Sequence, residues 1–195
     1  MGKTILIDGQ SHLAGRLASI CAKELLNGSK IIIVKSDKIE ISGKHIKNKN
    51  IMLKKTKKRT NTNPKRGPFH FHSPSQIFWK IVRGMLPHKT KKGTNALMNL
   101  RIFEGIPEPF DKMKRFIIPS ALRITRLLPG RKYSILGELC NQIGWTKKHV
   151  TDSMIWNKNI KSRLFYKFKI KAIKKRKTIL RGKINFLKMK IKSNI

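Results

Sequence analysis

The chain has 195 residues, which is enough to bury a hydrophobic core and to carry an extension beside it. It holds 46 lysines and arginines against 9 acidic residues, a formal net charge of +37, and such a charge indicates a polyanionic partner, with nucleic acid as the first candidate. The composition excludes a disulfide scaffold, because Cys21 and Cys140 are the only cysteines, and a membrane span, because no run of about 18 apolar residues occurs.

The acidic residues are missing from two long stretches of the chain. None lies between Glu40 and Glu104, and none follows Asp152. Lysines and arginines there have no acidic neighbours in sequence with which to pair, so a solvated surface of mixed charge does not explain these stretches. They are instead available to phosphates, which release counterions when cations neutralise them.

The first elements predict a βαβ unit. Thr4–Asp8 is a short apolar run typical of a strand, and residues 13–25 carry apolar side chains at helical spacing, with Ser11 as the expected cap. Asn27-Gly28 ends this helix, and the unalternating run Lys30–Ser36 predicts a strand covered on both faces. A strand, a helix and a strand in this order predict a parallel sheet and the α/β class.

The glycine turn after the first strand does not match a nucleotide-binding loop. The spacing from Gly9 to Gly15 fits neither the Walker A pattern nor the Rossmann fingerprint. We expect Gly15 to allow close packing of the helix on the strand, and the helix N-terminus near Ser11 and His12 to be able to hold a phosphate.

The middle of the chain alternates basic helices and loops. Residues 45–59 predict a weak lysine-rich helix, and residues 60–73 predict an irregular loop. Pro74 opens a helix that Pro87 ends. A short helix over 93–100 and a short strand over 101–103 are expected to follow.

The last third becomes increasingly basic. Residues 134–143 predict a helix, and the chain beyond Lys147 has a helical pattern with a thin apolar seam. We therefore expect a core domain over residues 1–150 and a basic, largely helical extension over residues 151–195. The end of the extension has too little apolar surface to fold alone and is expected to become ordered on nucleic acid.

Two segments favour RNA as the nucleic acid. Arg59–His72 combines cations for phosphates, amides for base edges and rings for stacking, a mixture that suits irregular RNA. The alternatives are an ordinary surface loop, or half of a metal site at His70 and His72. Lys80–Lys92 adds further cations, and Gly93 is expected to let the backbone approach a phosphate closely.

No catalytic constellation is visible. The acidic group of Glu104, Glu108 and Asp111 lies on a proline-rich loop among lysines, where local charge balance is the favoured role. The two cysteines lie in helical apolar patterns and are interpreted as reduced core thiols, since zinc needs about four clustered ligands. We expect no enzymatic activity, no cofactor, no metal and no small-molecule substrate.

Longer motifs resemble one family. Ile7-Asp8-Gly9 followed by Gly15–Ala18, the stretch Asn61–Gly93, the stretch Phe103–Lys112 and the stretch Leu127–Trp145 are similar to the universal large-subunit ribosomal protein family number thirteen, in its eukaryotic cytosolic form. The resemblance implies a three-layer α/β/α domain around a small, mostly parallel sheet. It also implies a structural role in the large ribosomal subunit, with assembly in the nucleolus, work in the cytoplasm, and large-subunit ribosomal RNA and neighbouring ribosomal proteins as partners.

The RNA contacts expected from these basic segments and from the resemblance are one set of side chains. They are Arg16, Lys58, Arg59, Lys65, Arg66, His70, His72, Lys80, Arg83, His88, Lys89, Lys91, Lys92, Arg131 and Lys132. Two other kinds of partner, duplex DNA and a membrane surface, would also attract this charge. A DNA-packaging protein has no use for the aromatic and histidine content of the loop, and a membrane-surface helix needs a broad apolar face that the extension lacks.

Overall fold

The computed structural model describes residues 3–193, and the chain divides into two compact units, residues 1–152 and residues 153–195. The first unit is built on a parallel sheet of β1 (Thr4–Asp8), β2 (Lys30–Val34) and β4 (Leu100–Ile102), in the order β1-β2-β4. The registers Ile7↔Ile33 and Ile33↔Ile102 align the three strands. The predicted α/β class with a small, mostly parallel sheet is confirmed.

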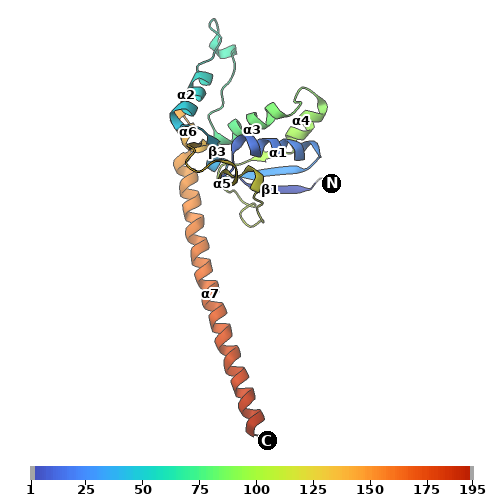
Figure 1. The fold of residues 1–195 in the computed structure, drawn as a ribbon, viewed down its shortest axis with the longest axis vertical. Helices are drawn as coiled ribbons and strands as arrows, with labels where there is room; N and C mark the ends of the chain where they lie inside the picture. Colours follow the sequence, from blue (N-terminus) through green and yellow to red (C-terminus); the bar gives the residue numbers. More distant parts are fainter. Residues whose placement is uncertain (1–2, 194–195) are drawn as a thin grey trace. The chain divides into compact units, whose positions relative to one another are not determined.

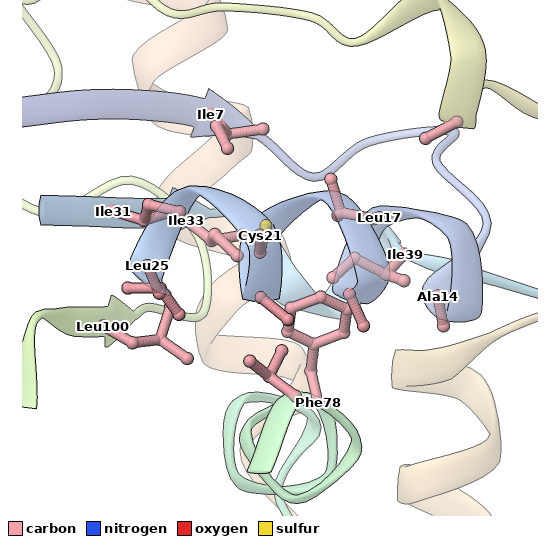
Figure 2. Packing of buried hydrophobic residues seen from close by; sticks show 14 of the residues in the cluster. Ile7, Ala14, Leu17, Cys21, Leu25, Ile31, Ile33, Ile39, Phe78 and Leu100 are labelled. Atoms are coloured by element: carbon pink, nitrogen blue, oxygen red, sulfur yellow. The ribbon is translucent and has the colours of Figure 1, made fainter. Parts of the chain in front are cut away.

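Three helices cover one face of this sheet: α1 (Ala14–Leu26), α3 (Pro74–Met85) and α4 (Lys91–Met98). Figure 2 shows Phe78 projecting from α3 toward α1, in the same apolar cluster as Ile31 and Ile33 of β2. These three side chains are fully buried, as expected for an unalternating β-branched strand and an amphipathic helix. The main hydrophobic core therefore lies between the sheet and its helices.

The other face of the sheet is covered by a loop. Leu6, Ile32 and Val34 form a second apolar cluster, against which Phe103 and Phe110 pack. The two phenylalanine rings lie 5.4 Å apart between centroids. In the described part of the chain, apolar side chains of the loop after β4 thus form the layer on this face.

The remaining elements of the first unit lie beyond the carboxyl end of β2. A 3₁₀ turn (η1, Ser36–Lys38) leads into β3 (Glu40–Ser42), which pairs antiparallel with β5 (Tyr133–Ile135). The shorter pieces are α2 (His45–Thr56), η2 (Pro64–Arg66), η3 (Pro119–Ala121), α5 (Arg123–Arg126) and α6 (Leu136–Ile143). In Figure 1, α2 and the loop that follows it extend away from the sheet.

A single helix, α7 (Lys148–Ser193), begins in the first unit and forms the described part of the second. Its 46 residues correspond to a length of about 70 Å. The seam residues Leu164, Phe165 and Phe168 are all at least half exposed. No helix within residues 3–193 is both long and apolar enough to cross a membrane.

The start of α1 differs from the prediction. Ser11 is not the cap, since the helix begins at Ala14 after Leu13 and Ser11 has a left-handed backbone with φ 60°. The segment before the helix is instead held by bridges from His12 to Leu122 and from Leu13 to Glu40. These long-range hydrogen bonds keep residues 11–13 extended or turned, so no helix N-terminus exists at His12 to bind a phosphate.

The close approach that was expected at Gly15 occurs at Gly9 instead, where the chain passes the end of β2. A side chain at Gly15 would meet nothing within 4 Å, whereas a Cβ at Gly9 would lie 3.0 Å from the backbone oxygen of Val34. Gly9 therefore permits the close approach of the chain to the end of β2. The predicted helix over 134–143 also starts late, because Tyr133–Ile135 forms β5 and α6 begins at Leu136.

His12 gives the first unit a predicted dependence on pH. Its side chain is fully buried, with Nδ1 donating to the Gln10 carbonyl at 2.9 Å and Nε2 accepting from the Ile118 N–H at 3.0 Å. These partners select the neutral ring, and burial lowers the pKa of His12 below 6.5, against smaller opposing effects of the Gln10 hydrogen bond and Asp8.

The unfolded chain therefore binds a proton that the folded chain does not as pH falls below about 6.5. Stability is expected to be highest above this pH and to decline toward pH 5. His12→Gln should be less stable at pH 7.5 by about 1–3 kcal/mol and should lose much of the decline. Urea midpoints measured at several pH values test this, and an equal decline in both proteins would contradict it. Burial raises the pKa of Asp37 and Glu40, a contribution of opposite sign that both proteins share.

Candidate nucleic-acid interface

The carboxylates of the first unit are largely engaged within the fold. Asp8 Oδ2 accepts from Lys35 Nζ at 2.9 Å, and Glu40 pairs with Arg123 at 2.7 Å. Glu104 Oε1 accepts hydrogen bonds from Ser75 Oγ at 2.8 Å and from Ser75 N at 3.4 Å, in the first turn of α3. Glu104 thus satisfies donors at the start of α3, a role that the sequence did not indicate.

Among the described residues, the cations predicted to contact RNA have no carboxylate partner of this kind. Within the part of the chain that the structure describes, no salt bridge joins any of them to a carboxylate. Most are exposed, and Arg83, His70 and His88 are partly buried. Their positive charge is thus directed to solvent or to a partner, and three groups of them can be distinguished.

The first group lies at the end of α2 and along the following loop. It comprises Lys58, Arg59, Lys65, Arg66, His70 and His72. His70 Nε2 donates to the Lys58 carbonyl at 2.6 Å and fastens the returning loop to the end of α2. His70 also lines a hollow of about 610 Å³ together with Lys80 of α3, so the structure brings together two predicted contacts from different elements.

The metal alternative for His70 and His72 finds no support in residues 3–193. No cluster of three or more histidine, cysteine or acidic side chains that would suit a metal ion occurs there. The cysteines are both buried, and burial raises the pKa of each thiol to about 12. They are core thiols, as predicted.

The second group forms the corner between α3 and α4, with Lys80, Arg83, His88, Lys89, Lys91 and Lys92. Thr90 Oγ1 accepts from the Gly93 N–H at 3.3 Å and so starts α4 at Lys91. Gly93 is buried, and a Cβ there would overlap the Pro87 carbonyl. The prediction that Gly93 faces a phosphate is therefore wrong: its missing side chain allows α4 to pack against the end of α3.

The third group surrounds a hollow of about 600 Å³ beyond the β3–β5 ladder. Arg131 and Lys132 line it as predicted candidates, and Lys44 and Arg126, which sequence reasoning missed, line it as well. The Gly43 N–H donates to the Lys132 carbonyl at 2.8 Å and continues the pairing of Ser42 with Tyr133. We call this cluster of Lys44, Arg126, Arg131 and Lys132 the cationic hollow.

The cationic hollow has the properties of an anion site. No acidic residue lines it, and its cations converge from two segments that the ladder holds together. Arg126 Nε donates to the Ser120 carbonyl at 3.0 Å, which positions the guanidinium. Arg16, by contrast, is an exposed residue in the first turn of α1 and lines neither hollow.

The basic surface on an α/β core agrees with the comparison to known proteins. The sequence model of the ribosomal protein L13 family matches residues 2–109. The chain belongs to the ribosomal protein L13 family. It is also 46% identical over 175 residues to the large ribosomal subunit protein uL13 of Spodoptera frugiperda, with 89% of this chain and 86% of that protein covered.

Membership of the L13 family confirms the resemblance seen in the motifs. It makes the chain a structural protein of the ribosome and not an enzyme. The family match spans the first two cationic groups, and the alignment with the insect relative extends over most of the chain.

Proposed function

We propose that this chain binds large-subunit ribosomal RNA through its three cationic groups and holds that RNA in its folded arrangement. As an L13-family protein, it is a structural constituent of the large ribosomal subunit. The observation that carries the proposal is the contrast in pairing: Asp8, Glu40 and Glu104 are engaged inside the fold, while the candidate cations have no salt bridge among residues 3–193. Neutralising them requires an external polyanion.

The start of α4 supports an external anion specifically. Lys91 and Lys92 occupy its first turn, where the helix dipole disfavours positive charge, and no acidic residue lies in that turn. Two lysines at this position weaken the isolated helix, and a phosphate near the backbone N–H groups would reverse that cost. Stabilisation by bound RNA thus accounts for a charge pattern that the protein alone does not favour.

The second unit is proposed to add an extended contact with RNA. After Asp152 the chain has no acidic residue, and side chains from Ser153 to residue 184 are mostly exposed. A long basic helix whose side chains are mostly exposed, as these are up to residue 184, gains stability from phosphates along its length. We propose residues 1–150 as the RNA-docking core and residues 151–195 as an extension that follows RNA.

Location and partners complete the proposal. The chain is a ribosomal protein, and we propose that it joins the subunit in the nucleolus and works in the cytoplasm. Neighbouring ribosomal proteins are proposed as further partners.

Sedimentation of cell lysate on sucrose gradients tests the proposed function. The protein is expected in large subunits and polysomes, and it should remain there at high salt. Free protein at the top of the gradient, or protein on chromatin, would contradict ribosomal RNA as the partner and favour a DNA-binding role. Binding of purified protein to structured RNA and to duplex DNA at equal salt gives an independent comparison.

Arg83→Ala is expected to weaken RNA binding at every RNA sequence tested. Arg83 lies in the last turn of α3 without a salt bridge among the described residues, so its loss removes one phosphate contact. The slope of log K against log salt should become shallower by roughly one. Lys23→Ala, an exposed cation in the last turn of α1, is the control for net charge and should leave the slope unchanged. Equal slopes for both variants would remove Arg83 from the interface.

A further inference from the structure

The hollow between α2 and α3, which we call the α2–α3 groove, is unlike the rest of the cationic surface. Its volume is about 610 Å³, within the range of small-ligand sites. The floor is aliphatic and includes Met52, Ile77 and Ile81, which also pack against the main core. Phe71 contributes an aromatic side chain to the wall and is 38% exposed. The groove therefore offers an apolar surface that this unit leaves uncovered.

The walls of the groove are held in place by interactions outside it. Asn48 Nδ2 of α2 donates to Ser134 Oγ at 2.9 Å, and His45 Nε2 donates to Gln142 Oε1 of α6 at 3.1 Å. The Phe71 ring meets the Trp79 ring edge-on, with centroids 6.4 Å apart and planes at 78°. The Phe71 face is thus positioned before any partner arrives.

The α2–α3 groove does not result from loose attachment of α2 to the rest of the unit. α2 has twelve residues and buries none of them, yet it is tied to β5 and α6 through the hydrogen bonds of Asn48 and His45. Ile51 on its groove side is 44% exposed. α2 is therefore fixed on one side, while its other side leaves an apolar face open toward α3 that a partner can occupy.

The charges around the groove select the occupant. Lys55 and Lys80 line it, and none of its lining residues is acidic. An occupant that combines an apolar body with negative charge fits this lining, and a nucleotide has both. His70 and Lys80 belong both to the groove and to the proposed RNA contacts, so the groove is continuous with the proposed interface.

We propose that the α2–α3 groove receives an unstacked base of the ribosomal RNA. The base lies against Phe71 and the aliphatic floor, while Lys55 and Lys80 face the adjoining phosphates. Extruded bases of irregular RNA are commonly stacked on aromatic side chains in this way. The inference rests on the proposed function and specifies one contact within it.

Methyl NMR of the full chain tests the groove directly. Isoleucine methyls are labelled, and the protein is titrated with single-stranded hexaadenylate and with an abasic hexamer of equal phosphate number. Hexaadenylate is expected to shift the methyls of Ile51, Ile77 and Ile81 through the ring current of a bound base. Ile5 and Ile20, which line a separate apolar hollow, serve as internal controls and should not shift. The abasic hexamer should bind without moving the groove methyls.

Phe71→Ala provides a second measurement. It is expected to weaken hexaadenylate binding by between about fivefold and a hundredfold, the range for one stacked base, and to leave abasic binding unchanged. Phe116→Ala is the matched control, because Phe116 is 52% exposed, lies outside Arg59–His72 and lines a separate hollow. Far-ultraviolet circular dichroism confirms that both variants are folded.

The outcomes separate the groove from the function as a whole. Hexaadenylate that binds without shifting the groove methyls, or that shifts them no more than the abasic hexamer does, overturns the base-binding groove and leaves RNA binding intact. Failure to bind either hexamer or ribosomal RNA overturns the proposed function as well. An acidic, apolar peptide that shifts the groove methyls where hexaadenylate does not would assign the groove to a protein partner and overturn the RNA assignment.

Discussion

Phe78→Ala is expected to lower the free energy of unfolding of the first unit by about 3–5 kcal/mol. Phe78 is fully buried on α3, and its ring projects toward α1 in the main core (Figure 2). Removing the ring loses the transfer free energy of its carbon atoms and leaves a cavity that helices tied to a sheet do not fill completely. A loss of this size is a large fraction of the total stability of an ordinary domain.

The same substitution at an exposed phenylalanine isolates the effect of burial. Phe69 is 79% exposed, so Phe69→Ala should change the free energy of unfolding by no more than about 0.5 kcal/mol. Urea titrations followed by the fluorescence of the three tryptophans, of which Trp145 is buried, measure both variants at constant salt. Equal midpoints for the two variants would show that α3 does not depend on Phe78 for its packing on α1.

The Phe78 substitution also links the core to the interface. α3 carries Lys80 and Arg83 on its outer side and Phe78 on its inner side. Detachment of α3 would displace these cations, so RNA affinity is expected to fall together with stability. Moderate cooling should restore RNA affinity together with the folded fraction, because refolding of α3 returns Lys80 and Arg83 to the surface.

The elements with long, regular patterns could be predicted from the sequence. The continuous apolar run of β2 is typical of a buried strand. The apolar residues of α1 and α3 recur often enough to identify helical spacing. The βαβ order then favours parallel pairing of β1 with β2, because the helix between them supplies the crossover connection that parallel strands need. The family resemblance added an independent and confirmed assignment of fold.

The pairing of β3 with β5 could not be predicted, for a physical reason. β3 and β5 have three residues each, too few for an alternation to be visible. Their pairing depends on hydrogen bonds between segments about ninety residues apart, of which Ser42↔Tyr133 is one register pair. The start of α1 was misjudged for the same reason, because Leu122 and Glu40 hold the residues before it.

The candidate interface shows the same division between local and long-range information. Composition indicated a polyanionic partner, because the stretches without acidic residues can be seen directly in the sequence. It did not reveal which cations converge. Lys44 follows one glycine turn and Arg131 follows another, and only the β3–β5 ladder brings them to one hollow. Gly93 shows the converse error, since a glycine in a basic segment serves packing against Pro87.

The cationic hollow allows a prediction of large effect on RNA binding. Replacing all four of its cations (Lys44, Arg126, Arg131 and Lys132) with glutamine should remove up to four phosphate contacts. The slope of log K against log salt is then expected to become shallower by about three, at 0.7–0.9 per phosphate. If the two proteins bind equally at 1 M salt, the variant is therefore expected to bind on the order of a thousandfold more weakly than the unchanged protein at 0.1 M.

A matched variant distinguishes a site from general electrostatic attraction. Glutamine at Lys3, Lys23, Lys112 and Lys114 removes the same four charges from exposed positions outside the three cationic groups. If affinity came from net charge alone, the two quadruple variants would have equal slopes, because a protein of charge +37 would lose the same fraction of its charge in each. A shallower slope for the hollow variant, measured on large-subunit ribosomal RNA with both proteins folded, assigns phosphates to the hollow. Equal slopes would instead mean that convergence of cations at the end of the β3–β5 ladder contributes nothing beyond their number.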